Sequence, residues 1–145
     1  MTTLNNIITA ANQSEYATRH GTQMHARLQK ITQSDIISPT DDIAKSISAN
    51  SELRKIFLDT SLTEVPVAGT INGRFISRRI DRMHIDHQNK TIQILDYKTD
   101  TDPNIRRNAY IYQIREYIDL VRAIYPDYTV YGYILWTHDF SLERI

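Results

Sequence analysis

The sequence contains no cysteine, and only four glycines and four prolines in 145 residues. Without thiols the chain cannot form a disulfide, a thiolate zinc site or a Cys-ligated iron–sulfur cluster, so any metal must be held by nitrogen or oxygen. No apolar run approaches the roughly 20 residues of a membrane-spanning helix. The start of the chain also lacks the basic segment and apolar run of a secretory signal. We therefore expect a cytoplasmic protein with no membrane partner.

The length and composition are typical of one globular domain. Hydrophobic residues make up 41% and charged residues 23%, which are ordinary values for a folded soluble chain. No repeat, low-complexity tract or linker divides the sequence, and its length is close to the roughly 150 residues of an average domain. We expect a single domain that covers residues 1–145.

The formal net charge of zero conceals an uneven distribution. Residues 74–115 carry nine Lys or Arg against five Asp or Glu, whereas the segments on either side are acidic in balance. Cations bound by those central carboxylates would make this region more positive still. The neutral total therefore does not exclude a phosphate-rich ligand, although it argues against tight, sequence-independent coating of DNA.

The spacing of apolar residues changes from a helical period to a strand period near Leu62. Before it we expect a helix with Thr22 as N-cap, and a helical region over 41–58 with a break at Asn50 and a cap at Ser51. After it the pattern predicts strands over 62–68, 73–86 and 91–98, a helix over 107–124, a strand over 128–137 and a short segment over 140–145. Gly69 and the polar residues 86–89 separate the first three strands. This order predicts an α/β fold, with a central mixed sheet of four to five strands flanked by helices.

Two aspartates fall among apolar residues of the predicted strands. Strand alternation places Asp96 on one face with Ile92 and Ile94, and it groups Asp81 with Phe75 and Met83. A buried carboxylate is costly unless it is paired or bound to metal. The turn at 86–89 makes the two strands neighbours, so the two acids can meet, and a divalent cation would relieve their repulsion. Simple ion pairs, of Asp81 with Arg79 or Arg82 and of Asp96 with Lys98, explain the spacing equally well.

A wider set of short motifs favours the first interpretation. In chain order they are Gly21-Thr22-x-x-His25, Glu64-x-Pro66, Gly73-Arg74 leading to Ile80-Asp81-Arg82, Ile94-Leu95-Asp96-Tyr97-Lys98-Thr99-Asp100 and Gln113-x-x-x-Tyr117. Together they resemble the RecB-like branch of the PD-(D/E)XK nuclease superfamily over roughly residues 19–145. The likeness is greatest to the C-terminal nuclease domains of helicase-nuclease subunits of the AddA type, and it implies a restriction-endonuclease-like core.

The resemblance implies a metal site and a catalytic lysine. His25, Asp81, Asp96 and the main-chain carbonyl of Tyr97 would bind Mg²⁺ or Mn²⁺, and Lys98 would act on the attacking water and the phosphate charge. Many relatives also carry a Cys-bound iron–sulfur cluster, which this chain cannot hold.

Further residues receive roles from the same resemblance. Glu64 would assist catalysis by holding a second metal or a water, or it is only a charge at a strand edge. Gln113 and Tyr117 would contact DNA or brace the lysine, unless they form a polar pair at the edge of the core. Arg74 and Arg82 would grip phosphates, unless they form surface ion pairs.

The expected function is therefore a divalent-metal-dependent deoxyribonuclease, the exonuclease module of a helicase-nuclease that acts on single-stranded DNA ends in double-strand break repair. The chain has no Walker A loop of its own, so a helicase domain or partner subunit would separate the strands. Two alternatives remain at this point. One is a catalytically inactive scaffold that binds DNA or protein, and the other is a stand-alone restriction-like endonuclease.

Overall fold

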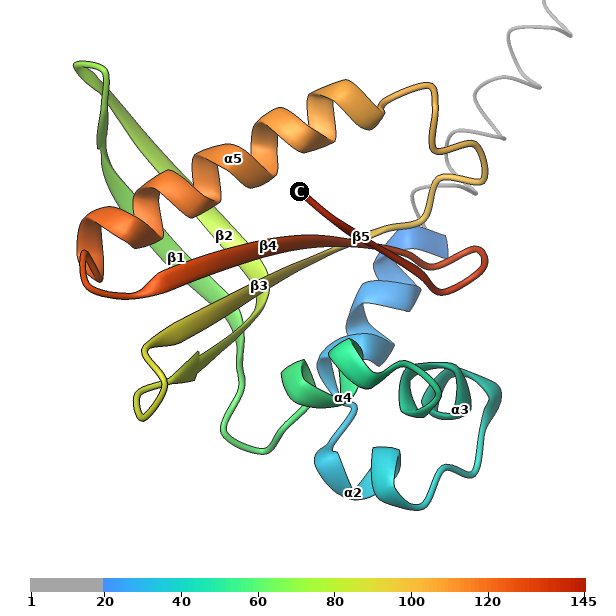
Figure 1. The fold of residues 1–145 in the computed structure, drawn as a ribbon. Coiled ribbons are helices and arrows are strands. Elements are labelled where there is room, and N and C mark those ends of the chain that lie inside the picture. The colour runs from blue at the N-terminus through green and yellow to red at the C-terminus, as the bar shows by residue number, and fades with distance from the viewer. Residues whose placement is uncertain (1–19) are drawn as a thin grey trace, which may run out of the picture.

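The computed structural model describes residues 20–145, and the part of the predicted domain before residue 20 lies outside them. A helix over residues 20–29 comes first. It is followed by α2 (Gln33–Ile37), α3 (Asp42–Ser48), α4 (Ser51–Ile56), β1 (Leu62–Ile71), β2 (Arg74–Asp86), β3 (Thr91–Lys98), α5 (Arg107–Ile124), β4 (Thr129–Trp136) and β5 (Ser141–Arg144). The strands form one sheet in the order β1-β2-β3-β4-β5 (Figure 1), in which only β3 and β4 are parallel. The predicted α/β class, with a mixed sheet flanked by helices, is confirmed.

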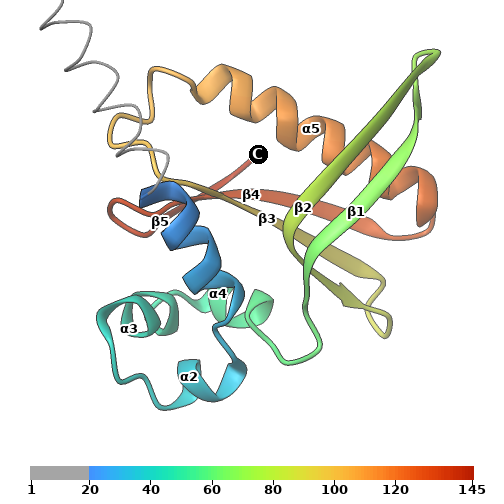
Figure 2. The same cartoon turned by 180° about the vertical axis from the view of Figure 1, so that it is seen from behind.

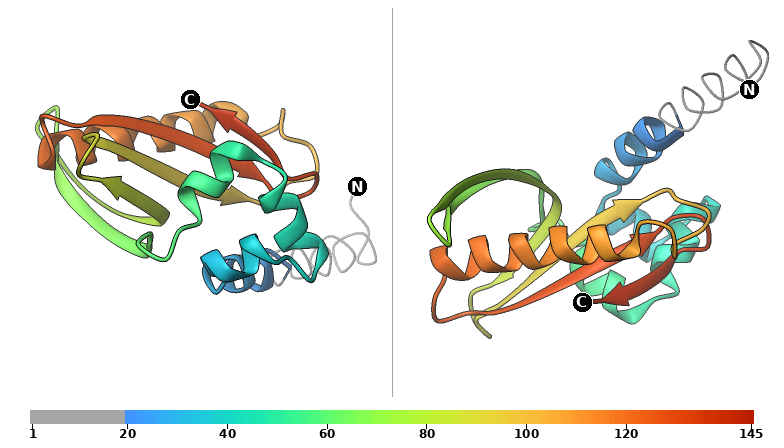
Figure 3. Two further views of the ribbon diagram at one scale, coloured as in Figure 1. Left: turned by 60° about the horizontal axis from the view of Figure 1, so that its bottom comes forward. Right: turned by 90° about the horizontal axis from the view of Figure 1, so that it is seen from above.

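Helices cover both faces of the sheet. One core lies between the sheet and α5 and includes Ile80, Ile94 and Ile114. The other lies against the helix over 20–29 and the short helices, and includes Leu28, Leu53 and Leu95. Figure 3 shows α5 along one side of the sheet and α2–α4 on the other. Among the described residues, no helix is both long and apolar enough to cross a membrane.

Several predicted element boundaries need correction. Thr22 lies inside the first helix, which already includes His20, so Thr22 is not its N-cap. The break near residue 50 exists, but the cap of α4 is Asn50, whose side chain accepts hydrogen bonds from the first turn, and not Ser51. The helix α2 was not predicted from the sequence. It begins with a capping box formed by Thr32 and Asp35.

The β1–β2 hairpin is longer than predicted and extends away from the rest of the sheet. Gly69 does not end β1, because the strand continues to Ile71 and turns at Asn72 and Gly73. These two residues have φ angles of 51° and 76°, as a two-residue type I′ turn requires. β2 pairs with β3 only over residues 82–86, so its first half leaves the sheet with β1. Figure 2 shows this hairpin extending beyond β3 and β4, away from α2–α4.

Gly132 of β4 sets how closely α5 can approach the sheet. A Cβ atom at this position would lie 2.4 Å from Ile114 Cγ2 and 2.8 Å from Ile118 Cδ1. Those distances are far inside van der Waals contact, so α5 could keep its present position only over a residue without a side chain. The same helix carries two of the residues expected at the active site, Gln113 and Tyr117.

We predict that Gly132→Ala lowers the free energy of unfolding by about 1–3 kcal/mol, because overpacking forces α5 away from the sheet. Urea denaturation would measure the loss. Gly69→Ala is the matched control, since its Cβ would meet only the end of the Leu120 side chain at 3.2 Å. Equal stability of Gly132→Ala and the unmodified chain would contradict this description of the core.

Candidate active site

The site is built where the ladder between β2 and β3 stops. The last paired residues are Arg82 and Leu95, and beyond them the backbone of Tyr97 faces no strand on that side. Two side chains replace the missing strand. The carboxylate Oδ2 of Asp81 accepts the Tyr97 N–H at 2.8 Å, and Nε2 of His25 lies 3.1 Å from the Tyr97 carbonyl oxygen. The interrupted ladder thus draws His25 and Asp81 to the backbone of one residue, Tyr97, with His25 Nδ1 3.8 Å from Asp81 Oδ1.

Asp81 stands at the point where β2 changes the face that it presents to α5. Ile80 and Met83 both belong to the core beneath α5. They are three positions apart, so strict alternation would have put them on opposite faces of the strand. The predicted grouping of Phe75 with Met83 is therefore wrong, since Met83 is buried in that core and Phe75 is 69% exposed on the outer side of the hairpin. Opposite Asp81 in the register is Glu64, whose φ of 53° is strained for a residue with a side chain.

Asp96 and Lys98 lie on the face of β3 that is covered by α5. Lys98 Nζ is 2.8 Å from Asp96 Oδ2 and donates a hydrogen bond of 2.9 Å to Gln113 Oε1 on α5. The contact with Asp96 is an ion pair without hydrogen-bond geometry, so Asp96 Oδ2 is buried with no hydrogen-bond donor. Buried acceptors are almost always satisfied. This oxygen is therefore a candidate ligand for a cation.

The two acids repel each other in a buried site. Burial raises the pKa of Asp81 well above its ordinary value, and the neighbouring Asp96 carboxylate raises it further. The same two carboxylates add to the effect of burial in raising the pKa of Tyr117. Lys98 offsets part of the negative charge from one side. A divalent cation would offset the remainder.

The donor set fits Mg²⁺ or Mn²⁺. It consists of two carboxylates, one carbonyl oxygen and one imidazole, which are hard oxygen ligands and a nitrogen that suits Mn²⁺ somewhat better. Within residues 20–145 no three His, Asp or Glu side chains stand in a ready-made metal cluster. The His25 imidazole instead contacts the Tyr97 carbonyl, and both groups belong to the set that would hold the ion.

The first described turn of the helix over 20–29 lies close to the segment that follows β3. A Cβ atom on Gly21 would lie 3.3 Å from Thr99 Oγ1, which is tighter than most such contacts. The absence of a side chain at Gly21 lets the helix approach the segment that follows Lys98. This close approach helps to place His25, one helical turn later, beside Tyr97.

Gln113 and Tyr117 form a brace for the lysine. Gln113 accepts from Lys98 through its carbonyl oxygen and donates from Nε2 to the Tyr117 hydroxyl at 2.8 Å. Tyr117 is only 2% exposed, so the expectation that it contacts DNA is wrong. Its position is compatible with the other predicted role, the support of Lys98.

Arg82 has a structural position and cannot reach a phosphate on the surface. It is 3% exposed, and its guanidinium donates to the Tyr97 hydroxyl, to Ser61 Oγ and to the carbonyl of Leu28. It also lies over the Phe57 ring at 4.1 Å. The prediction of a DNA contact is therefore corrected. Arg82 ties the carboxyl end of the first helix to β2, where a cation is favourable.

The remaining predicted residues lie at the border of the site or beyond it. The Glu64 carboxylate stands 3.7 Å from Arg79 Nη1 and is partly exposed. No contact joins it to Asp96 or Lys98 within the described residues. Arg74 is exposed at the hairpin tip, seven residues from Asp81 along β2, which is about 23 Å at 3.3 Å per residue.

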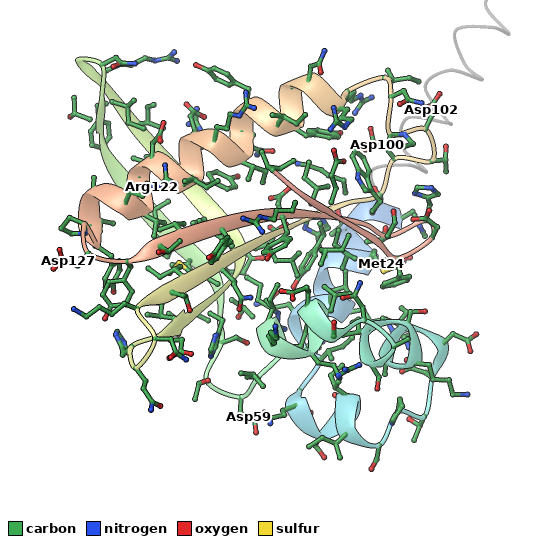
Figure 4. All side chains as sticks on the ribbon, viewed as in Figure 1. Met24, Asp59, Asp100, Asp102, Arg122 and Asp127 are labelled. Carbon is green, nitrogen blue, oxygen red and sulfur yellow. The ribbon has the colours of Figure 1, made fainter. Side chains whose placement is uncertain are left out.

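Tyr110 and Asp100 lie near the lysine, and a role in positioning it was not predicted for them from the sequence. The Tyr110 ring lies 4.2 Å from Lys98 Nζ, and its hydroxyl donates to Asp100. Asp100 follows Lys98 on the loop between β3 and α5, where Figure 4 labels it. A signal was available, because Tyr110 precedes Gln113 by three residues and so shares its helix face.

We predict that Asp81→Asn stabilises the metal-free protein at pH 9 by about 1–2 kcal/mol, or several degrees in Tm, with little effect at pH 5. The folded-state pKa of Asp81 is raised, so its contribution to stability is full below the unfolded pKa near 4 and is lost as pH rises through the folded value. Asparagine retains an acceptor for the Tyr97 N–H without the charge. Thermal unfolding in EDTA would give the Tm at both pH values, with the exposed Asp119→Asn as control. A lower Tm for Asp81→Asn at pH 9 would contradict the assigned repulsion.

Comparison with known protein families finds no family model that matches this chain, and comparison with curated proteins finds no significant match.

Proposed function

We propose that this chain is a divalent-metal-dependent nuclease that hydrolyses phosphodiester bonds in DNA. One observation carries the proposal: two buried acids meet beside an imidazole at an interrupted strand ladder, and a lysine stands within ion-pair distance of one of them. The RecB-like motifs of the sequence assign the same residues to one site. An ordinary structural ion pair would explain Asp96 with Lys98, but it would not explain why Asp81 and His25 both contact the backbone of Tyr97, the residue between them.

The cation would be held by His25, Asp81, Asp96 and the carbonyl oxygen of Tyr97. When bound, a Mg²⁺ or Mn²⁺ ion supplies Lewis acidity, which lowers the pKa of a coordinated water and polarises a phosphate oxygen. The burial of Asp96 beside Asp81 and the raised pKa of Asp81 both support a cation at this place.

Lys98 is the proposed catalytic cation. Three groups hold its ammonium at one position: the Asp96 carboxylate, the Gln113 carbonyl and the face of Tyr110. A fixed ammonium can orient the attacking water and balance the charge that develops on the phosphate oxygens, without reorganising during the reaction. Gln113 and Tyr110 act through Lys98, so they are positioning residues.

The biological setting that we propose is the exonuclease module of a helicase-nuclease that receives single-stranded ends during double-strand break repair. This part follows the sequence resemblance, in which a motor domain or partner subunit supplies the unwound strand. An inactive scaffold is the competing reading, and a cleavage assay separates the two. The experiment is incubation of linear single-stranded DNA with the purified protein and Mn²⁺ or Mg²⁺, with EDTA as the blank.

We predict that Lys98→Met lowers the rate of metal-dependent cleavage by at least about a hundredfold, as expected for a group that acts on the attacking water. Gel analysis of labelled single-stranded DNA would measure it. Lys45→Met, at an exposed position of α3, is the matched control and should keep full activity. Full activity of a folded Lys98→Met protein would remove the lysine from the mechanism.

We also predict that His25→Ala weakens Mn²⁺ binding by roughly ten- to a hundredfold, because it removes one ligand from the proposed set. Calorimetric titration would give the affinity directly and does not depend on activity. His87→Ala serves as the control, since His87 lies in the β2–β3 turn and contacts Tyr128. An unchanged Mn²⁺ isotherm for His25→Ala would exclude His25 as a ligand.

A further inference from the structure

The β1–β2 hairpin projects from the candidate active site and carries an unusual surface. Residues 65–80, which form most of it, include three arginines and no acidic residue. Arg78 faces α5 and pairs with Glu116. Arg74 and Arg79 are exposed, and Arg79 has only the distant contact with Glu64. The hairpin is therefore locally basic on a molecule of zero net charge.

The outer face of the hairpin combines one large aromatic ring with small neighbours. On β2 this face presents Arg79, Ser77 and Phe75, and all three are exposed. On β1 the residues paired with them are Pro66, Ala68 and Thr70. Phe75 is 69% exposed, so it contributes little to either core. A strip with a protruding ring and a guanidinium offers stacking and phosphate contacts, the two elements that bind single-stranded nucleic acid.

The spacing along the strip matches a nucleic-acid strand. Residues two apart on one strand face lie about 6.6 Å apart, close to the roughly 6.8 Å of two stacked nucleotides at 3.4 Å each. Phe75 is six residues from Asp81, a separation of about 20 Å or roughly six nucleotides. A strand that lies along the hairpin would thus run from the ring toward Asp81, at the point where β2 joins β3.

We propose that the outer face of the β1–β2 hairpin binds single-stranded DNA and guides it into the active site. Phe75 stacks on a base about six nucleotides from the scissile bond. Arg79 contacts a phosphate between that base and the scissile bond. The proposal rests on the proposed function, because it takes Asp81 and Asp96 as the place of cleavage. An apolar tip can also bind a protein, but the two exposed arginines and the absence of acids from residues 65–80 favour a polyanion.

The test uses the full chain and two thymidine oligonucleotides, dT12 and dT4. Binding of fluorescein-labelled dT12 is measured by anisotropy in EDTA, where no cleavage occurs. We expect Phe75→Ala and Arg79→Gln to raise the Kd for dT12 by about fivefold to fiftyfold each. In Mn²⁺ both variants should raise KM for dT12 with kcat unchanged, and Phe75→Ala should leave the cleavage of dT4 unaffected, because dT4 is too short to reach from the acids to the ring.

Tyr112→Ala and Arg122→Gln are the matched controls, since both residues are exposed on α5 (Arg122 is labelled in Figure 4). Unchanged Kd and KM for both hairpin variants would overturn the proposal that the hairpin guides DNA. That result would leave the nuclease proposal intact if the unmodified chain cuts dT4. If the hairpin variants lose dT12 binding while the unmodified chain cuts neither oligonucleotide, the binding surface is supported and the proposed nuclease activity fails.

Discussion

The interruption of hydrogen bonding between β2 and β3 is the constraint on which the site depends. A strand inside a sheet must satisfy each N–H and C=O, since an unpaired buried group costs as much as a lost hydrogen bond. β2 leaves β3 after the Arg82–Leu95 pair, and the N–H and C=O of Tyr97 are contacted instead by the carboxylate of Asp81 and the imidazole of His25. Side chains from two distant segments are thereby held at the backbone of a single residue by a requirement of the backbone itself.

The arrangement is unfavourable to the folded chain in the absence of a ligand. Asp81 and Asp96 are desolvated side by side, Asp96 Oδ2 has no hydrogen-bond donor, and Glu64 adopts a strained backbone conformation opposite Asp81. Local departures from favourable folding tend to be kept where function requires them. The buried guanidinium of Arg82 compensates in part, because it fixes the first helix to β2 through the carbonyl of Leu28.

Periodic elements were predictable from the sequence, and the local geometry of the site was not. The helix over 107–124 was predicted with its observed bounds, since an amphipathic stripe that ends before Pro126 fixes both ends. Asn72-Gly73 is a strong hairpin signal that was overlooked in favour of Gly69. The change of face at Asp81 could not be inferred from alternation, which assumes a regular strand. The burial of Arg82 depends on partners more than 50 residues away in the chain, which no local pattern reveals.

The same divergence of strands accounts for both the site and the hairpin beside it. If β2 continued to pair with β3, Tyr97 would be bonded to backbone, Asp81 would have no peptide to complete, and residues 74–80 would lie within the sheet. Because β2 diverges, its second half remains fixed to β3 while its first half projects with β1 and carries Phe75 and Arg79 outward. α5 crosses over between the parallel strands β3 and β4 and brings Gln113 to Lys98 from the opposite side. One strand divergence and one crossover are therefore enough to place the acids, the lysine and the exposed basic strip near one another, while the first helix brings the imidazole to them.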